Sequence, residues 1–324
     1  MKLSWLLAIL AAVSLGSPAA AQQSAAAPPA APHAAPTGVQ AAPPASNGQA
    51  TIVKNVNTVP LTFLALDRKG HFVPGLTASQ VEILDNGEPQ TIQRFDAQGN
   101  LPMRVVLLLD ISNSIRTRWE FEQRAAIDFL QSVLTPGRDQ AMVVGFDTTP
   151  HIAQPFTDNE PKLAQAIRGL NPGGGTALYD TIYLISHDYL GPGAPGGGEM
   201  RNVIVVISDG ADDQSRYSRD EALGMAQDAG AVIYTIGTEP TRLDPTDDKV
   251  LERFAQQTGG RSFFPMRASD LGVAFRSIIT DLRHQYVVSY SPNNFVPDGA
   301  FHTVQIKIHL KGVTARTRKG YFAR

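Results

Sequence analysis

The middle of the chain alternates short apolar runs with segments that have helical periodicity. The apolar runs are nearly continuous, as in strands that helices cover on both faces. The predicted strands are Val105–Leu109, Ala141–Phe146, Val203–Ile207, Ala231–Gly237 and Arg261–Phe264. The predicted helices are Arg118–Leu134, Pro161–Gly169, Ala177–Tyr189, Arg219–Ala229, Val250–Thr258 and Ala268–Leu282. This order predicts an α/β fold with a doubly wound, mostly parallel sheet.

The period of the pattern changes to two on both sides of this segment. Asn86-Gly87 marks a two-residue hairpin on the amino-terminal side. The alternating apolar positions are Leu61, Phe63 and Ala65 before the α/β segment, and Tyr286, Val288, Tyr290, Val304, Ile306, Ile308 and Leu310 after it. Neither β piece is large enough to be stable alone. We therefore expect the two pieces to pair into one small β-sandwich, in which the α/β domain is inserted.

The first 21 residues have the pattern of an export signal. Lys2 precedes an apolar stretch from Leu3 to Gly16, and Ala19 and Ala21 form a small-x-small cleavage pattern before Gln22. The stretch is shorter than the roughly 20 residues of a spanning helix. Residues 22–49 are almost all Ala, Pro, Gly, Ser and Gln, which is typical of a flexible linker. The sequence thus predicts a secreted or periplasmic protein.

Composition narrows the classes of function. The 324 residues are 43% hydrophobic and carry a net charge of −2, which argues against a general nucleic-acid-binding protein. Cysteine is absent, so disulfides, thiolate metal sites and cysteine nucleophiles are excluded. No segment after the signal is long and apolar enough to span a membrane. The expected division is a signal at 1–21, a linker at 22–49, a β module at 50–100 and 284–324, and the α/β domain at 101–283.

Five oxygen-bearing side chains follow the predicted strands. Asp110, Ser112 and Ser114 come directly after the first strand, Thr176 follows three glycines, and Asp209 follows the third strand. The carboxyl ends of parallel strands meet at one edge of a sheet, so we expect these side chains to lie close together. Carboxylate and hydroxyl oxygens suit a hard divalent cation. The sequence therefore predicts a site for Mg²⁺ (or Mn²⁺).

These motifs resemble a known family. Residues 101–282, with D-x-S-x-S at 110–114, G-G-G-T at 173–176 and S-D-G at 208–210, are similar to a von Willebrand factor type A domain with an intact metal-ion-dependent adhesion site. The resemblance implies hydroxyl ligands from Ser112, Ser114 and Thr176, and carboxylates of Asp110 and Asp209 that act directly or through water. It also implies a sixth position open to an acidic residue of a protein partner. The flanking β segments resemble the secreted VWFA-related proteins of acidobacteria.

Three functions fit this reading. The main hypothesis is an exported protein-binding module of adhesion type that engages a partner carboxylate through Mg²⁺, with no catalytic residues. A Mg²⁺-assisted hydrolase is the second, although no His or Glu lies in the metal motifs to act as a base. A structural envelope component with a purely structural metal is the third.

Some features stay open at this level. Asp212 and Asp213 either hold a second cation or belong to a solvated loop that leads to a helix cap at Ser218. The basic residues between 299 and 324 either contact anionic envelope polymers or keep a sheet edge soluble. The sequence identifies neither the ligand nor the oligomeric state.

Overall fold

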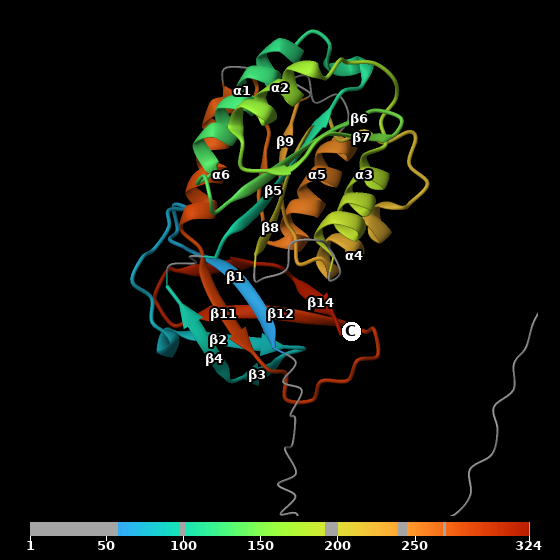
Figure 1. Ribbon diagram of the computed structural model, residues 1–324. Helices are drawn as coiled ribbons and strands as arrows, with labels where there is room; N and C mark the ends of the chain where they lie inside the picture. The colour runs from blue at the N-terminus through green and yellow to red at the C-terminus, as the bar shows by residue number, and fades with distance from the viewer. Residues whose placement is uncertain (1–57, 98–100, 192–199, 239–244, 268–269, 324) are drawn as a thin grey trace, which may run out of the picture. The chain divides into compact units, whose positions relative to one another are not determined.

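The structure is a computed structural model that describes residues 58–97, 101–191, 200–238, 245–267 and 270–323 (Figure 1). All of these residues belong to one compact unit, Lys54–Arg324. The expected export signal and the linker lie outside the described residues. Within the described ranges, no helix combines the length and apolar character that a membrane crossing requires.

The centre of the α/β part is a six-stranded sheet. Its strands, in spatial order, are β10 (Ser262–Phe263), β9 (Val232–Gly237), β8 (Arg201–Ser208), β5 (Met103–Asp110), β6 (Gln140–Phe146) and β7 (Pro150–Thr157). Neighbouring strands are parallel, except that β7 runs antiparallel to β6 at one edge. The predicted mostly parallel, doubly wound sheet is confirmed.

Helices cover both faces of this sheet, as Figure 1 shows. The helices are α1 (Trp119–Val133), α2 (Glu160–Gly169), α3 (Leu178–Ile185), α4 (Arg219–Asp228), α5 (Pro245–Thr258) and α6 (Leu271–Arg283). On β5, Leu107 and Leu109 pack with α1, α2 and α6, whereas Val106 and Leu108 pack with α3, α4 and α5. All eight residues of β5 are buried, which explains why its sequence is a nearly continuous apolar run.

Three elements differ from the sequence-based prediction. Strand β7 was not predicted, because it is an edge strand that contains Pro150 and Pro155 and is half exposed. Helix α5 begins at Pro245, five residues before the predicted start at Val250. Helix α3 ends at Ile185 and continues as a π-helical turn, Ser186–Leu190, so the predicted single helix to Tyr189 changes its hydrogen-bonding pattern.

The flanking segments form two four-stranded antiparallel sheets. One has the order β13 (Thr314–Thr317), β1 (Val59–Leu66), β11 (Tyr286–Tyr290) and β4 (Ile92–Asp96). The other has the order β14 (Gly320–Phe322), β12 (Phe301–Ile308), β2 (Val81–Asp85) and β3 (Glu88–Gln90). Each sheet combines strands from before and after the α/β domain, so the predicted pairing of the two flanks is confirmed.

Local details of the sandwich follow from its sequence. Asn86 and Gly87 have φ angles of 48° and 87°, the left-handed conformation that a tight hairpin between β2 and β3 requires. Strand β12 ends at Ile308, and Leu310 is 41% exposed, so the predicted alternation runs two residues too far. Inside the sandwich, the hydroxyls of Tyr290 and Tyr321 donate to Oδ2 of buried Asp85 at 2.8 and 2.7 Å.

Candidate metal centre

Asp110 ends strand β5 and is held on both carboxylate oxygens. Its side chain is 1% exposed. Oδ1 accepts a hydrogen bond from the Ser112 backbone N–H at 2.8 Å, and Oδ2 accepts one from the Ser208 hydroxyl at 2.7 Å. Ser208 is the last residue of β8, which pairs in parallel with β5. The carboxylate therefore points into the edge where these two strands end.

The hydroxyls of the first loop join the end of β8. Ser112 Oγ lies 2.9 Å from Ser114 Oγ, and Ser114 Oγ donates to Asp209 Oδ2 at 2.7 Å. Asp110, Ser112, Ser114 and Asp209 thus form one connected group of oxygen atoms. The expectation that strand ends distant in sequence converge on one edge holds for these four residues.

The glycine-rich loop lies beside this group. The Gly173 N–H donates to Ile111 O at 2.6 Å, and the Asn113 N–H donates to Gly174 O at 3.3 Å. Gly174 has a φ of 92°, and a Cβ there would lie 3.1 Å from Asp147 Cβ, so only glycine suits this turn. These bonds place the loop that carries Thr176, a buried residue, next to the loop that carries the two serines.

Asp212 and Asp213 hold the Thr176 loop in place. Asp213 Oδ1 accepts from the Thr176 N–H at 2.7 Å, and Asp212 Oδ2 accepts from the Tyr179 N–H at 2.8 Å and from the Ser215 hydroxyl at 2.6 Å. Both side chains therefore hold the loop that carries Thr176 against the loop that follows Asp209. Neither of the two interpretations from the sequence included this role. The capping box that follows, with Ser218 and Glu221, is confirmed.

Burial gives the centre unusual electrostatics. Desolvation raises the pKa of Asp110 from its ordinary value of 3.8 to about 6, against the hydrogen bonds from Ser208 and Ser112 that lower it. The neighbouring carboxylate of Asp209 raises it further. An ionised Asp110 without a cation is therefore costly, and a bound cation would relieve that cost. The residues present fit a divalent ion in this respect.

The sequence analysis did not identify two residues near the candidate metal centre, Ser208 and Glu122. Ser208 orients Asp110, although it was visible only as part of the S-D-G motif. Glu122, on α1, is 2% exposed, and burial raises the pKa of its carboxyl to about 7. The positive charge of Arg118 lowers this pKa, and the negative charges of Asp110 and Asp209 raise it. No short motif marks Glu122, because it lies on a helix outside the loop sequences.

The donor set is rich in hydroxyls and poor in carboxylates. Within the described part of the chain, no three His, Cys, Asp or Glu side chains gather as a metal-binding cluster. The hydrogen-bonded group instead combines two carboxylates with the hydroxyls of two serines. This all-oxygen chemistry suits Mg²⁺ or Mn²⁺ better than metals that prefer nitrogen or sulfur.

Comparison with known proteins identifies one domain family. The family model described as von Willebrand factor type A domain matches residues 105–278, more than half of the chain. A UPF0353 protein of Mycolicibacterium paratuberculosis is 26% identical over 206 residues, which are 56% of this chain and 62% of that protein. A UPF0353 protein of Mycobacterium leprae (strain TN) is 27% identical over 207 residues, 56% of this chain and 61% of that protein. The chain thus spans about three fifths of the length of these curated relatives.

Two solved structures of bacterial proteins are similar to parts of this chain. The conserved hypothetical protein BatB from Bacteroides thetaiotaomicron has a TM-score of 0.46 and 18% identity, covering 56% of this chain and 97% of that one. A von Willebrand factor type A protein from Catenulispora acidiphila has a TM-score of 0.46 and 15% identity, covering 82% of this chain and 73% of that one.

Proposed function

Because this chain belongs to the von Willebrand factor type A domain family through residues 105–278, we propose that it is a metal-dependent protein-binding module. The observation that carries the proposal is the connected group of oxygens from Asp110, Ser112, Ser114 and Asp209 at the carboxyl edge of the sheet. These four residues and Thr176 would hold Mg²⁺ or Mn²⁺. The bound ion would supply an electrophilic position for a carboxylate of a partner protein.

The protein's own residues prepare this site in three ways. Ser208 and the Ser112 N–H fix the orientation of the Asp110 carboxylate. The hydroxyl ligands are neutral, so the site adds little negative charge of its own and leaves a cation attractive to an acidic partner. Asp213 holds the backbone at Thr176, which keeps the second loop in register with the first. A partner would then recognise the metal edge together with the surrounding loop surfaces.

The pattern of residues 1–21 supports export, so we expect the partner in the periplasm or outside the cell. The likeness of the flanks to secreted VWFA-related proteins agrees with this place of action.

The first experiment is capture of partner proteins from an envelope extract, with Mg²⁺ or with EDTA. We expect capture in Mg²⁺, loss in EDTA and recovery when Mg²⁺ is restored. Thr176→Ala should abolish capture, whereas Thr280→Ala, which removes an exposed hydroxyl on α6, should not. A captured partner that stays bound equally well in EDTA would show that the metal is structural and that the binding proposal is wrong.

The second experiment separates binding from turnover. The hydrolase alternative has one observation in its favour, the buried Glu122 carboxyl with its pKa near neutrality, because a general base needs such a pKa. We expect the purified protein to leave phosphate and ester substrates intact in the presence of Mg²⁺. Hydrolysis that both Asp209→Ala and Glu122→Gln abolish would replace the binding proposal with the enzyme.

A further inference from the structure

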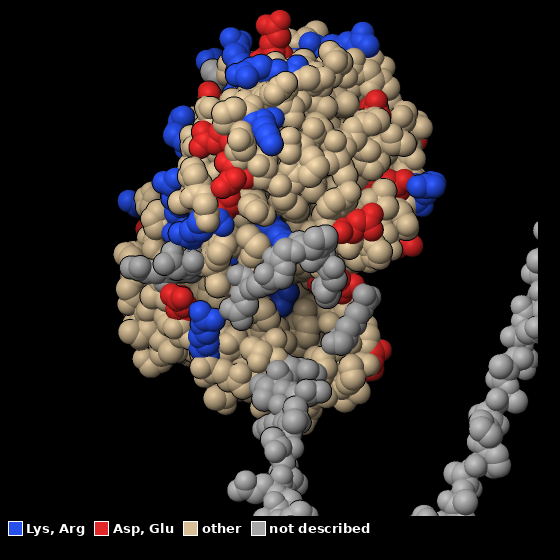
Figure 2. All heavy atoms as spheres, in the orientation of Figure 1, with Lys and Arg blue, Asp and Glu red and all other residues tan. Residues whose placement is uncertain are grey.

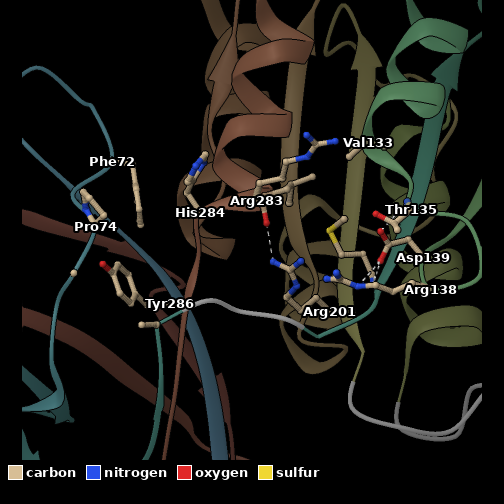
Figure 3. Close-up of a pocket in the computed structure, with 14 residues that line it drawn as sticks. Phe72, Pro74, Val133, Thr135, Arg138, Asp139, Arg201, Arg283, His284 and Tyr286 are labelled. Carbon is tan, nitrogen blue, oxygen red and sulfur yellow. Dashed lines mark hydrogen bonds and ion pairs between the residues drawn. The ribbon is translucent and has the colours of Figure 1, made fainter.

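A pocket of about 560 Å³ opens at the opposite edge of the central sheet from the metal centre (Figure 3). Met103 and Arg201, the first residues of β5 and β8, lie in its wall. Strand β5 leads from Met103 to Asp110, a span of about 23 Å at the usual rise per residue. The pocket is therefore a site separate from the candidate metal centre.

One wall of the pocket is cationic. Three arginines line it from separate elements: Arg138 from the loop before β6, Arg201 from β8 and Arg283 from the end of α6. In the surface view of Figure 2, lysine and arginine side chains also gather over the end of α6. Among the described residues that line the pocket, Asp139 is the only one with a carboxylate. The lining thus holds three guanidinium groups against one carboxylate.

The single carboxylate is already engaged by backbone donors. Asp139 is 1% exposed, and its two oxygens accept from the Met103 N–H and the Thr135 N–H, each at 3.0 Å. Arg138 Nε lies 3.6 Å from Oδ1 of the same residue. Asp139 therefore balances part of the charge of Arg138. Burial lowers the pKa of Arg201, the charge of Asp139 raises it in part, and no carboxylate of the described residues lies at ion-pair distance from this guanidinium. Arg283 donates from Nη2 to Ser132 O at 2.7 Å and is turned away from the other two arginines (Figure 3).

Arg201 is the central group of the cationic wall. It is 8% exposed, and its guanidinium donates only to neutral acceptors: Leu101 O at 3.3 Å, Leu282 O at 2.8 Å and Gln285 Oε1 at 2.9 Å. These bonds use Nε and Nη1. Nη2 has no hydrogen-bond partner among the described residues. Figure 3 shows Arg201 in the pocket between the aromatic side chains of Phe72 and Tyr286 on one side and Arg138 on the other. A buried charge with free donors is the arrangement that an anion stabilises.

The facing wall is aromatic. The ring centroid of Phe72 lies 5.0 Å from that of His284 and 5.5 Å from that of Tyr286. Tyr286 is fixed because its hydroxyl donates to Val73 O at 2.9 Å and accepts from the Leu76 N–H at 3.1 Å. His284 is fixed by a hydrogen bond from Nδ1 to Thr280 O at 2.7 Å. Flat apolar surface therefore stands opposite the guanidinium groups.

We propose that this pocket binds a small molecule in which a phosphate or carboxylate group is joined to a flat apolar body. The anionic group lies against Arg201 and Arg138, which both donate to Leu101 O and so lie side by side, and guanidinium donors recognise planar or tetrahedral oxyanions in pairs. The apolar body lies against Phe72 and His284. The volume of the pocket is that of a typical small-molecule site. This inference does not depend on the metal-dependent function.

The test is calorimetric titration of the full chain in EDTA, which removes any contribution of a metal centre. The probes are phenyl phosphate, benzoate, inorganic phosphate and, as a neutral control, benzyl alcohol. We expect saturable binding of phenyl phosphate or benzoate and none of benzyl alcohol. The tighter of the two identifies the anionic group. Saturable binding of neither aromatic anion at millimolar concentration overturns the proposal.

Variants locate the site and keep the test independent of folding. Arg138→Gln changes an exposed side chain and should weaken binding roughly tenfold. Arg168→Gln, an exposed arginine on α2, removes the same type of charge elsewhere and should leave the affinity unchanged. Phe72→Ala should remove the advantage of phenyl phosphate over inorganic phosphate. Equal affinities in wild type and in Arg138→Gln would refute the pocket as the binding site.

Discussion

The buried Asp110 predicts a dependence of stability on pH that bound metal removes. In the metal-free protein the pKa of Asp110 is about 6, whereas an unfolded chain has a value of 3.8. The folded state therefore holds a proton between these pH values that the unfolded state has released. By linkage, the free energy of unfolding falls as the pH rises from about 4 to about 6, and it changes no further from this group above that range.

The magnitude follows from the two pKa values. A difference of about two units corresponds to about 3 kcal/mol, at 1.36 kcal/mol per unit, because the group is almost completely buried. Asp110→Asn keeps the shape of the side chain and removes the titration. We therefore expect the variant to lose this pH dependence and to be more stable than the wild type above pH 6, by up to that amount. Because the charge of Asp110 raises the pKa of Glu122, both proteins carry Glu122→Gln, and the difference between their curves then isolates Asp110.

The assay is denaturant unfolding between pH 4.5 and 7.5, in EDTA and in saturating Mg²⁺. Asp128→Asn, which removes an exposed carboxylate on α1, controls for the loss of one negative charge. In Mg²⁺ the wild type should lose the slope, because the cation favours the ionised carboxylate, and its metal affinity should fall below about pH 6 as protons compete. Wild-type and Asp110→Asn curves that stay parallel in EDTA would refute the role of burial at Asp110.

Three further predictions test the fold around the site. Tyr290→Phe should lower the free energy of unfolding by about 1.5–3 kcal/mol, because buried Asp85 loses one of its two hydroxyl donors; denaturation equal to wild type would show that the bond contributes nothing. Gly210→Ala should weaken Mg²⁺ binding in calorimetry, because the φ of Gly210 is 90° and the new Cβ would lie 2.6 Å from Asp247 O. Gly169→Ala, whose new Cβ would have no neighbour within 4 Å, should leave the Mg²⁺ affinity unchanged. Equal Mg²⁺ affinities of the two variants would contradict the strain argument. Deleting residues 50–100 removes β1 to β4 and should cause aggregation, because the apolar face of β12 loses its partner strand β2; light scattering that shows a soluble, cooperatively folding protein would argue against it.

Sequence patterns predicted the strands that are buried on both faces. Strands β5 and β8 were recognisable because both faces are covered, so the positions 105–109 and 203–207 are all apolar. Strand β7 was not, since one edge and much of its surface face solvent. Four of the five residues that the sequence assigned to the metal site, Asp110, Ser112, Ser114 and Asp209, lie together because the ends of β5 and β8 share one edge. The cationic pocket was invisible, because Arg138, Arg201 and Arg283 come from three elements with no common motif.

The insertion of the α/β domain into the sandwich has a consequence for the order of folding. Val287 pairs with Asp96, so the sandwich can close only after the intervening chain of roughly 190 residues has been made. If that chain were unfolded, bringing its ends together would cost on the order of 5 kcal/mol of entropy. The folded α/β domain removes most of this cost, because β5 starts beside the end of α6: the Arg201 guanidinium donates both to Leu101 O, just before β5, and to Leu282 O on α6. The sandwich is thus the last part to assemble during synthesis, and loss of the α/β fold would release its amino-terminal strands as well.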